Sequence, residues 1–207
     1  MPYLLGDASE SIIRLDQRYN GKRVSPGKDQ MTERIIIAGA GGQGAMLLGK
    51  VLSEAAMRSG KFITWLPSYG AEVRGGTAHC MVIISDTEIG SPYINKADIL
   101  IIMNAPSLEK FEARLKNNGL LILNSSLAGS PEKSSAHILK YPFTDIALSL
   151  GNIRVANMVA LGCLAAKIKI IAIKDVLKAI EKIAPEDKKN LVEINKQAVL
   201  AGAKLQK

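Results

Sequence analysis

Glycines at a fixed spacing are the residues of this chain best suited to chemistry. Gly39, Gly41 and Gly44 follow a G-x-G-x-x-G pattern, with Gly42 and Gln43 inside it. Glycine lets a chain turn tightly and lets backbone N–H groups approach a ligand. A helical pattern follows directly, and the first N–H groups of a helix are unpaired at the positive end of its dipole. The segment predicts a turn that binds phosphate or carboxylate, although many α/β turns need glycine for steric reasons alone.

A second segment, residues 67–76, combines charged residues with glycines. Glu72 and Arg74 lie in it, followed by Gly75 and Gly76. Arginine suits planar, bidentate contact with phosphate or carboxylate, and the glycines would let a ligand come close. Two interpretations stay open: these residues bind a small molecule, or Glu72 and Arg74 pair with nearby charges and only hold the loop.

The elements that must position these segments alternate between strand and helix patterns. Strands are expected at 34–38, 62–66, 79–85, 98–103, 120–124 and 137–141, and helices at about 44–58, 106–116, 154–166, 175–183 and 185–203. This order predicts an α/β fold: a three-layer Rossmann-like sheet, mostly parallel, with helices on both faces and a helical C-terminal segment. Ligands of such sheets bind beyond the carboxyl ends of the strands. Residues 39–44 and 67–76, taken to follow neighbouring strands, are therefore expected to lie close together.

Three of the expected helices carry recognisable packing patterns. The first should bury a face of Leu47, Leu48, Val51, Leu52 and Ala55. Residues 155–166 are apolar, rich in alanine and glycine, and predict a closely packed core helix. The last helix should begin at Pro185 and pack through Leu191, Ile194, Ala198 and Ala201.

Length and charge narrow the class of protein. The 207 residues suit one domain at 31–207, preceded by an N-terminal arm at 1–30. The net charge is +8, and residues 167–207 contribute ten lysines against five acidic residues, without aromatics. This pattern favours a solvated helix face, or a face for an acidic partner protein, over nucleic-acid binding. The most apolar stretch is too short for a membrane span, so no membrane partner is expected.

Catalytic and metal-binding sets are not evident. Cys80 and Cys163 form no C-x-x-C motif, and His79 and His137 are isolated, so neither a metal site nor a catalytic residue is expected. Two lone cysteines fit a reducing, cytoplasmic setting. A nicotinamide site would need an acid at the end of the second strand, and 65–68 has none. A Rossmann-like domain of this kind is most simply one component of a larger assembly.

Four segments in order resemble the gamma subunit of 2-oxoacid:ferredoxin oxidoreductases. They read GAGGQG at 39–44, PSYGAEVRGGT at 67–77, IGSP at 89–92 and NMVALG at 157–162. The similarity covers about residues 32–204. The sequence of the second segment resembles the enzymes for 2-oxoglutarate and for branched-chain 2-oxoacids more than those for pyruvate. Of these substrates we favour 2-oxoglutarate. The related indolepyruvate enzymes are a further alternative.

The resemblance implies a complex that oxidatively decarboxylates a 2-oxoacid, makes an acyl-CoA and reduces ferredoxin. It places thiamine diphosphate, magnesium and iron–sulfur clusters on alpha, beta and ferredoxin-like delta partner subunits. It gives this chain a role in assembly and in coenzyme A binding, for which the candidate residues are Gly39, Gly41, Gly42, Gln43, Gly44, Glu72, Arg74, Gly75 and Gly76. The alternative is a stand-alone NAD(P)-dependent dehydrogenase or a nucleotide-binding module.

Overall fold

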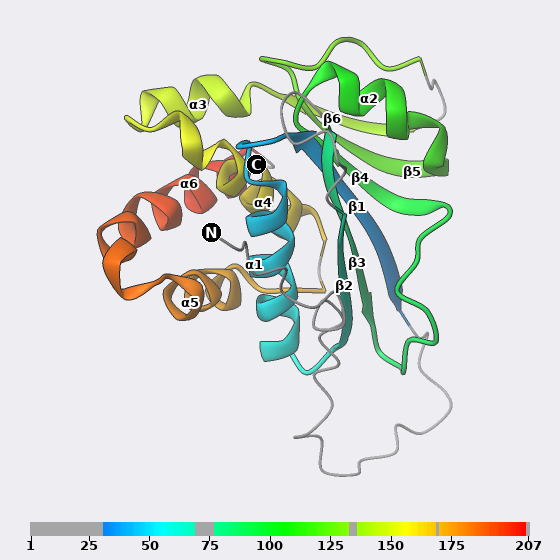
Figure 1. Ribbon diagram of the computed structural model, residues 1–207, viewed down its shortest axis with the longest axis horizontal. Helices are drawn as coiled ribbons and strands as arrows, with labels where there is room; N and C mark the ends of the chain where they lie inside the picture. Colours follow the sequence, from blue (N-terminus) through cyan, green and yellow to red (C-terminus); the bar gives the residue numbers. More distant parts are fainter. Residues whose placement is uncertain (1–30, 69–76, 133–135, 169, 206–207) are drawn as a thin grey trace, which may run out of the picture.

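The sheet has six strands in the spatial order β2-β3-β1-β4-β5-β6 (Figure 1). The structure, a computed structural model, describes residues 31–68, 77–132, 136–168 and 170–205. The strands are β1 Thr32–Ala40, β2 Phe62–Ser68, β3 Thr77–Ser85, β4 Ala97–Ile102, β5 Leu115–Asn124 and β6 His137–Tyr141. The helices are α1 Ala45–Arg58, α2 Ala105–Phe111, α3 Phe143–Ser149, α4 Ala156–Lys167, α5 Ile173–Ile183 and α6 Val192–Lys204, with 3-10 turns at Glu112–Arg114, Ile153–Val155 and Glu186–Leu191.

β1 is the centre of the sheet and is buried on both faces, as its isoleucine run predicts. Ile37 pairs with Ile101 of β4 on one side and with Cys80 of β3 on the other. β1, β4, β5 and β6 are parallel, whereas β3 runs antiparallel to both β1 and β2. The mostly parallel α/β sheet is therefore confirmed.

The expectation that residues 39–44 and 67–76 follow neighbouring strands is wrong. β3 lies between β1 and β2, because the chain reverses after β2 and returns as an antiparallel strand. Two reversals restore the original direction, so β2 and β1 still end at the same edge of the sheet. The sequence pattern alone does not reveal this insertion, since a buried antiparallel strand has the same apolar run as a parallel one.

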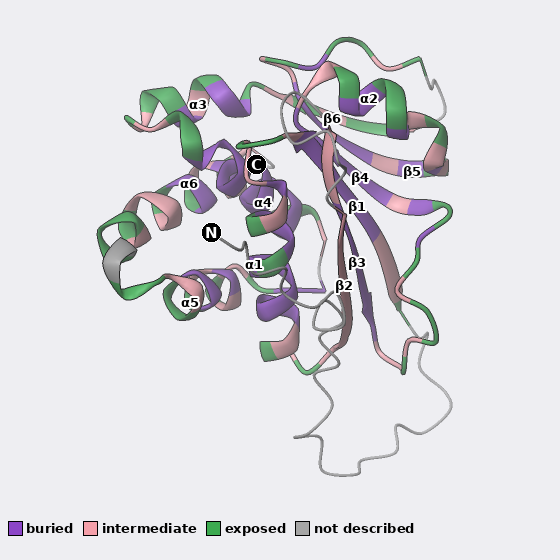
Figure 2. Ribbon diagram, in the orientation of Figure 1, coloured by how far each residue is buried: buried purple, intermediate pink, exposed green. Residues whose placement is uncertain are grey.

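Helices cover both faces and complete the three layers (Figures 1 and 2). Ile35 and Ile37 point to the face that packs on α1, α4, α5 and α6, while Ile36 and Ala38 point to α2. α1 buries Leu48, Val51, Leu52 and Ala55 as predicted, but Leu47 is 42% exposed. Leu47 lies in the first turn of α1, on the side of the helix that faces solvent.

α4 is the core helix that the apolar run predicts, and every residue from Ala156 to Ala165 is buried. Its contact with α6 depends on two glycines. A Cβ on Gly162 would lie 2.0 Å from the Val199 carbonyl oxygen, and one on Gly202 would lie 1.9 Å from the Val159 carbonyl oxygen. The two helix backbones therefore touch directly.

Several element boundaries differ from the prediction. The helix expected from Pro185 begins only at Val192, after a 3-10 turn, because residues 186–190 have no apolar side chain to pack; Leu191 stays exposed. The helix expected at 106–116 ends at Phe111, since Leu115 already pairs with Ala97. α3 was not predicted. No helix in the described ranges combines the length and apolarity needed to cross a membrane.

Candidate anion-binding site

The predicted glycine turn lies at the carboxyl edge of the sheet. β1 ends at Ala40 and α1 begins at Ala45, so the reversal takes four residues. The Gln43 N–H donates to the Ala40 carbonyl at 3.1 Å and closes the turn. Gly42 has φ +89° and Gly44 has φ +75°, conformations that L side chains rarely adopt. Gly41 and Gly42 are exposed, so the outer side of the turn faces solvent.

Gln43 braces the turn from within. Its Oε1 accepts the Ala40 N–H at 2.7 Å, and its Nε2 donates to the Met103 carbonyl at 3.4 Å. A Cβ on Gly39 would lie 2.8 Å from that Oε1 and 2.9 Å from Met103 Cβ. The contacts within the turn therefore explain why these positions are glycine and glutamine. Each polar end of the Gln43 side chain makes one bond within the chain, and on these bonds we assign Gln43 to shaping the turn.

The start of α1 has the features of an anion site. Gly44 is its N-cap and supplies no side-chain hydrogen bond, and the first turn contains no acidic residue. The first intrahelical bond runs from the Leu48 N–H to the Gly44 carbonyl, at 2.9 Å. In the part of the chain that the structure describes, the N–H groups of Ala45, Met46 and Leu47 find no acceptor. Free N–H groups at a positive helix end, without a competing carboxylate, favour an anionic ligand.

α4 brings a second helix N-terminus to the same place. The Asn157 carboxamide, near the start of α4, donates to the Gly44 carbonyl at 3.1 Å. α1 and α4 lie side by side and both run away from the carboxyl edge (Figure 1). Their positive dipole ends therefore add at the glycine turn.

A buried amide ties the neighbouring strand ends together. Asn124 closes β5, donates to the Met103 carbonyl at 3.1 Å and to Thr144 Oγ1 at 2.9 Å, and accepts the Thr144 N–H at 3.3 Å. The sequence analysis did not single out Asn124, Thr144 or Asn157 as site residues. Asn124 is a polar residue at the end of an apolar strand, and this pattern could have indicated a site residue from the sequence.

The second predicted segment lies mostly outside the described residues. This applies to Glu72, Arg74, Gly75 and Gly76, about which the structure says nothing. Its flanks are described: Ser68 pairs with His79, and Thr77 pairs with Ala40 of the glycine turn. The segment therefore leaves and rejoins the sheet at the edge where the turn lies, and the prediction for its four residues stays a prediction.

His79, at the same edge, is a packed imidazole that faces α2. Its ring centroid lies 4.7 Å from that of Phe111. Burial, and then the charges of Lys110 and Arg114, lower the pKa of His79, so the neutral form is favoured. Across the described ranges, no three His, Cys, Asp or Glu side chains are grouped so that they could hold a metal ion.

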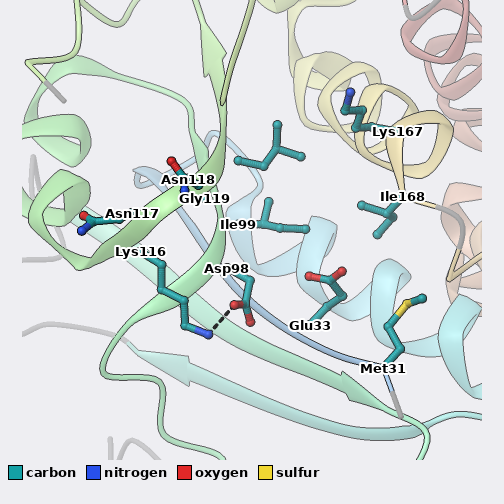
Figure 3. A pocket seen from close by; sticks show the side chains of 11 residues that line it. Met31, Glu33, Asp98, Ile99, Lys116, Asn117, Asn118, Gly119, Lys167 and Ile168 are labelled. Atoms are coloured by element: carbon teal, nitrogen blue, oxygen red, sulfur yellow. Dashed lines mark hydrogen bonds and ion pairs between the residues drawn. The ribbon is translucent and has the colours of Figure 1, made fainter. Parts of the chain in front are cut away.

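A hollow of about 490 Å³ opens at the opposite, amino edge of the sheet (Figure 3). Glu33, Asp98 and Lys116 line it together with Ile99 and the end of α4 at Lys167 and Ile168. The sequence analysis missed this cluster. Its signal was a charged residue at the start of each of three apolar strands.

The charges in this hollow are largely compensated within the chain. Asp98 accepts the Arg34 N–H at 2.9 Å, lies 3.7 Å from the Arg34 guanidinium and pairs with Lys116. Burial, and then the charge of Asp98, raise the pKa of Glu33, while Lys116 acts in the opposite direction. We interpret the hollow as a charged sheet edge and place the candidate site at the glycine turn.

Comparison with known proteins identifies relatives over most of the chain. Residues 34–205 match the family model described as pyruvate ferredoxin/flavodoxin oxidoreductase. The 2-oxoglutarate synthase subunit KorC of Methanothermobacter thermautotrophicus is 33% identical over 84% of this chain and 99% of its own length. The ketoisovalerate oxidoreductase subunit VorA of Methanothermobacter marburgensis is 37% identical over 64% of this chain. This chain spans only 28% of that longer relative.

Solved structures agree with this relationship. The keto/oxoacid ferredoxin oxidoreductase gamma subunit from Geobacter sulfurreducens superposes with a TM-score of 0.73 at 31% identity, covering 84% of this chain and 97% of that one. The 2-oxoglutarate:ferredoxin oxidoreductase from Magnetococcus marinus, solved with 2-oxoglutarate, coenzyme A and succinyl-CoA, superposes with a TM-score of 0.75 at 20% identity. It covers 86% of this chain and 31% of that one, and at this identity the likeness shows the fold.

Proposed function

This chain belongs to the pyruvate ferredoxin/flavodoxin oxidoreductase family as a gamma subunit, and on that premise we propose that it holds coenzyme A at the glycine turn of a 2-oxoacid:ferredoxin oxidoreductase. The complex would decarboxylate a 2-oxoacid, transfer the acyl group to the coenzyme A thiol and pass the electrons to ferredoxin. Thiamine diphosphate, magnesium and the iron–sulfur clusters would be held by alpha, beta and delta partner subunits.

The observation that carries this proposal is the uncapped start of α1. Coenzyme A is recognised through phosphate groups. The turn offers exposed backbone at Gly41 and Gly42, beside the N–H groups of Ala45–Leu47, for which no described residue is an acceptor. A net charge of +8 adds a general attraction for a polyanionic ligand. In this arrangement the chain binds and orients the ligand, and the reacting bonds lie on companion chains.

We propose 2-oxoglutarate as the substrate of the complex. The KorC relative, whose name specifies 2-oxoglutarate, aligns over 99% of its own length and supports this choice. The VorA relative, named for ketoisovalerate, supports a branched-chain substrate instead. Turnover of the purified complex with each 2-oxoacid in turn would decide between them, since the acid with the higher kcat/KM is the preferred substrate.

Two glycines provide a matched test of the coenzyme A site. Gly42 and Gly151 both have φ +89°, and a Cβ on either would meet nothing within 4 Å. Alanine therefore introduces backbone strain of similar size at both, about 1–2 kcal/mol. At Gly42 the new methyl group would also stand where the ligand lies.

The variants should be assayed in the complex co-expressed with its alpha and beta partners under anaerobic conditions. We expect Gly42→Ala to raise the KM for coenzyme A about tenfold, the loss of roughly one charge-assisted hydrogen bond. Gly151→Ala should leave that KM unchanged. An unaltered KM in Gly42→Ala with intact assembly would exclude the turn, and a wild-type chain that does not associate with its partners would exclude the subunit role.

The sheet order argues against the dehydrogenase alternative. In a dinucleotide-binding sheet, the strand next to the glycine turn ends in the acid that binds the ribose. Here that neighbour is β3, which begins rather than ends at this edge, and β2 ends at Ser68 without an acid. A thermal-shift titration separates the two functions, because a ligand at 100 times its Kd stabilises by about 2.7 kcal/mol. Stabilisation by NAD but not by coenzyme A would reverse our assignment.

A further inference from the structure

Asn157 joins α4 to the glycine turn, 113 residues away in sequence. Its side chain is 1% exposed. Its Nδ2 donates to the Gly44 carbonyl at 3.1 Å, and its Oδ1 accepts the Met158 N–H at 2.9 Å. The second bond uses an N–H of the first turn of α4 and holds the carboxamide in one orientation. The two bonds together direct the NH2 end of the buried carboxamide toward Gly44.

The fit between Asn157 and Gly44 is close on both sides. A Cβ on Gly44 would lie 2.3 Å from Asn157 Nδ2 and 2.9 Å from its Cγ. The carboxamide therefore packs directly on the bare Cα of Gly44. The left-handed conformation of Gly44, with φ +75° and ψ +24°, turns its carbonyl toward α4.

The Gly44 carbonyl belongs to the peptide plane that also contains the Ala45 N–H. Because the peptide is planar and trans, the direction of the carbonyl fixes the opposite direction of that N–H. The carbonyl is held twice, by Asn157 and by the Leu48 N–H at 2.9 Å. The Ala45 N–H is one of the donors at the start of α1 for which the described residues provide no acceptor. Asn157 therefore shares with the Leu48 N–H in fixing where a donor of the candidate anion site points.

We propose that Asn157 is a positioning residue of the coenzyme A site, acting through the Gly44–Ala45 peptide without touching the ligand. This inference rests on the proposed function. It also explains the residue type. Aspartate has no N–H to donate, would set its oxygen against the Gly44 carbonyl and would add negative charge beneath an anion. Alanine would leave the carbonyl held only by Leu48.

The test compares Asn157→Ala and Asn157→Asp with the control Asn152→Ala in the assembled complex. Asn152 is five residues away, and its carboxamide accepts the Arg154 N–H at 3.0 Å, a bond within its own segment. We expect the KM and the calorimetric Kd for coenzyme A to rise about fivefold in Asn157→Ala and more than tenfold in Asn157→Asp. The KM for the 2-oxoacid, the subunit stoichiometry and the behaviour of Asn152→Ala should stay as in the wild type.

The outcomes separate this inference from the proposed function. If Gly42→Ala weakens coenzyme A binding but both Asn157 variants bind within twofold of the wild type, Asn157 has no positioning role and the site stands. If Gly42→Ala also binds normally, the site and this inference fail together. A 2-oxoacid KM that rises in step with that for coenzyme A would indicate general damage and would overturn the inference. Alanine has a higher helix propensity than asparagine, so Asn157→Ala should keep α4 intact. It remains a valid test if Asn157→Asp does not assemble.

Discussion

Gly162→Ala should separate α4 from α6 and destabilise the chain. The new Cβ would lie 2.0 Å from the Val199 carbonyl oxygen, against 3.4 Å for an ordinary contact. The helices must therefore part by about 1.4 Å, the difference between these distances. The obstacle is backbone, so no side-chain rotation relieves it. The neighbouring residues Val159, Cys163 and Val199 all belong to the larger core cluster.

Two opposing effects determine how much the free energy of unfolding decreases in Gly162→Ala. Overpacking costs about 1–3 kcal/mol and sometimes more, and a backbone clash belongs at the upper end. Alanine gains about 1 kcal/mol over glycine in helix propensity. The net loss in the free energy of unfolding is about 2 kcal/mol. For a chain of 150–250 residues this lowers Tm by about 4–8 °C.

Thermal and urea unfolding of the full chain measure this loss. Gly129→Ala is the control, because a Cβ there meets nothing within 4 Å and φ is not positive. Gly202→Ala should behave like Gly162→Ala, since its Cβ would lie 1.9 Å from the Val159 carbonyl oxygen. One helix displacement relieves both clashes, so the double variant should lose about 1 kcal/mol less than the sum of the singles. A Gly162→Ala chain as stable as the wild type would refute the direct backbone contact.

Three further predictions concern ionisable groups. Asp86 accepts from Lys61 Nζ at 2.5 Å and from the Met31 N–H at 3.0 Å, and these bonds hold its pKa below the usual 3.8. Its stabilisation is present above pH 3.8 and disappears as pH falls through the lowered pKa. Asp86→Asn should therefore lower the free energy of unfolding at pH 7 by less than about 1 kcal/mol, and with it Tm, but should have no effect in strong acid. An equal Tm difference at all pH values would contradict this. The pKa of Glu33 is raised above 4.5, so ionisation of this carboxyl group destabilises the fold. Glu33→Gln should therefore raise Tm at pH 7 and give no gain below pH 4.5. A lower Tm of this variant at pH 7 would contradict the prediction. Burial raises the pKa of Cys80 to about 12, so a thiol reagent at pH 8 should label it only in denaturant; rapid labelling of the native chain would show that it is accessible.

Patterns that depend on burial were readable from the sequence, whereas strand neighbours were not. The strand expected at 34–38 and the core helix expected at 155–166 were both predicted correctly, because apolar runs of this kind must be buried. The place of β3 between β1 and β2 depends on long-range pairing that local periodicity does not encode. The predicted start of the last helix, at Pro185, was wrong for a related reason. Residues 186–190 look like a helix start but lack the apolar contacts that would hold them in an α-helix.

The candidate site was predictable to the same extent: its place was clear, but the reason for each glycine was not. The spacing of Gly39, Gly42 and Gly44 fits ligand binding and packing equally well. The structure separates the three. Gly39 is required by Gln43 and Met103, and Gly44 by Asn157, so a variant at either position disturbs the interior before it affects a ligand. Gly42 alone of these three combines an exposed position with empty space around its Cα.

This difference decides how mutational data on the turn must be read. A loss of coenzyme A affinity in Gly39→Ala or Gly44→Ala would not show that the ligand touches the turn, because a displaced Met103 or Asn157 gives the same result. The same loss in Gly42→Ala, with Gly151→Ala unaffected, cannot come from a displaced core side chain, since a Cβ at either position meets nothing within 4 Å and the two positions share the same φ. The contrast between Gly42 and Gly151 is therefore a sharper test of ligand contact at the turn than any variant at Gly39 or Gly44.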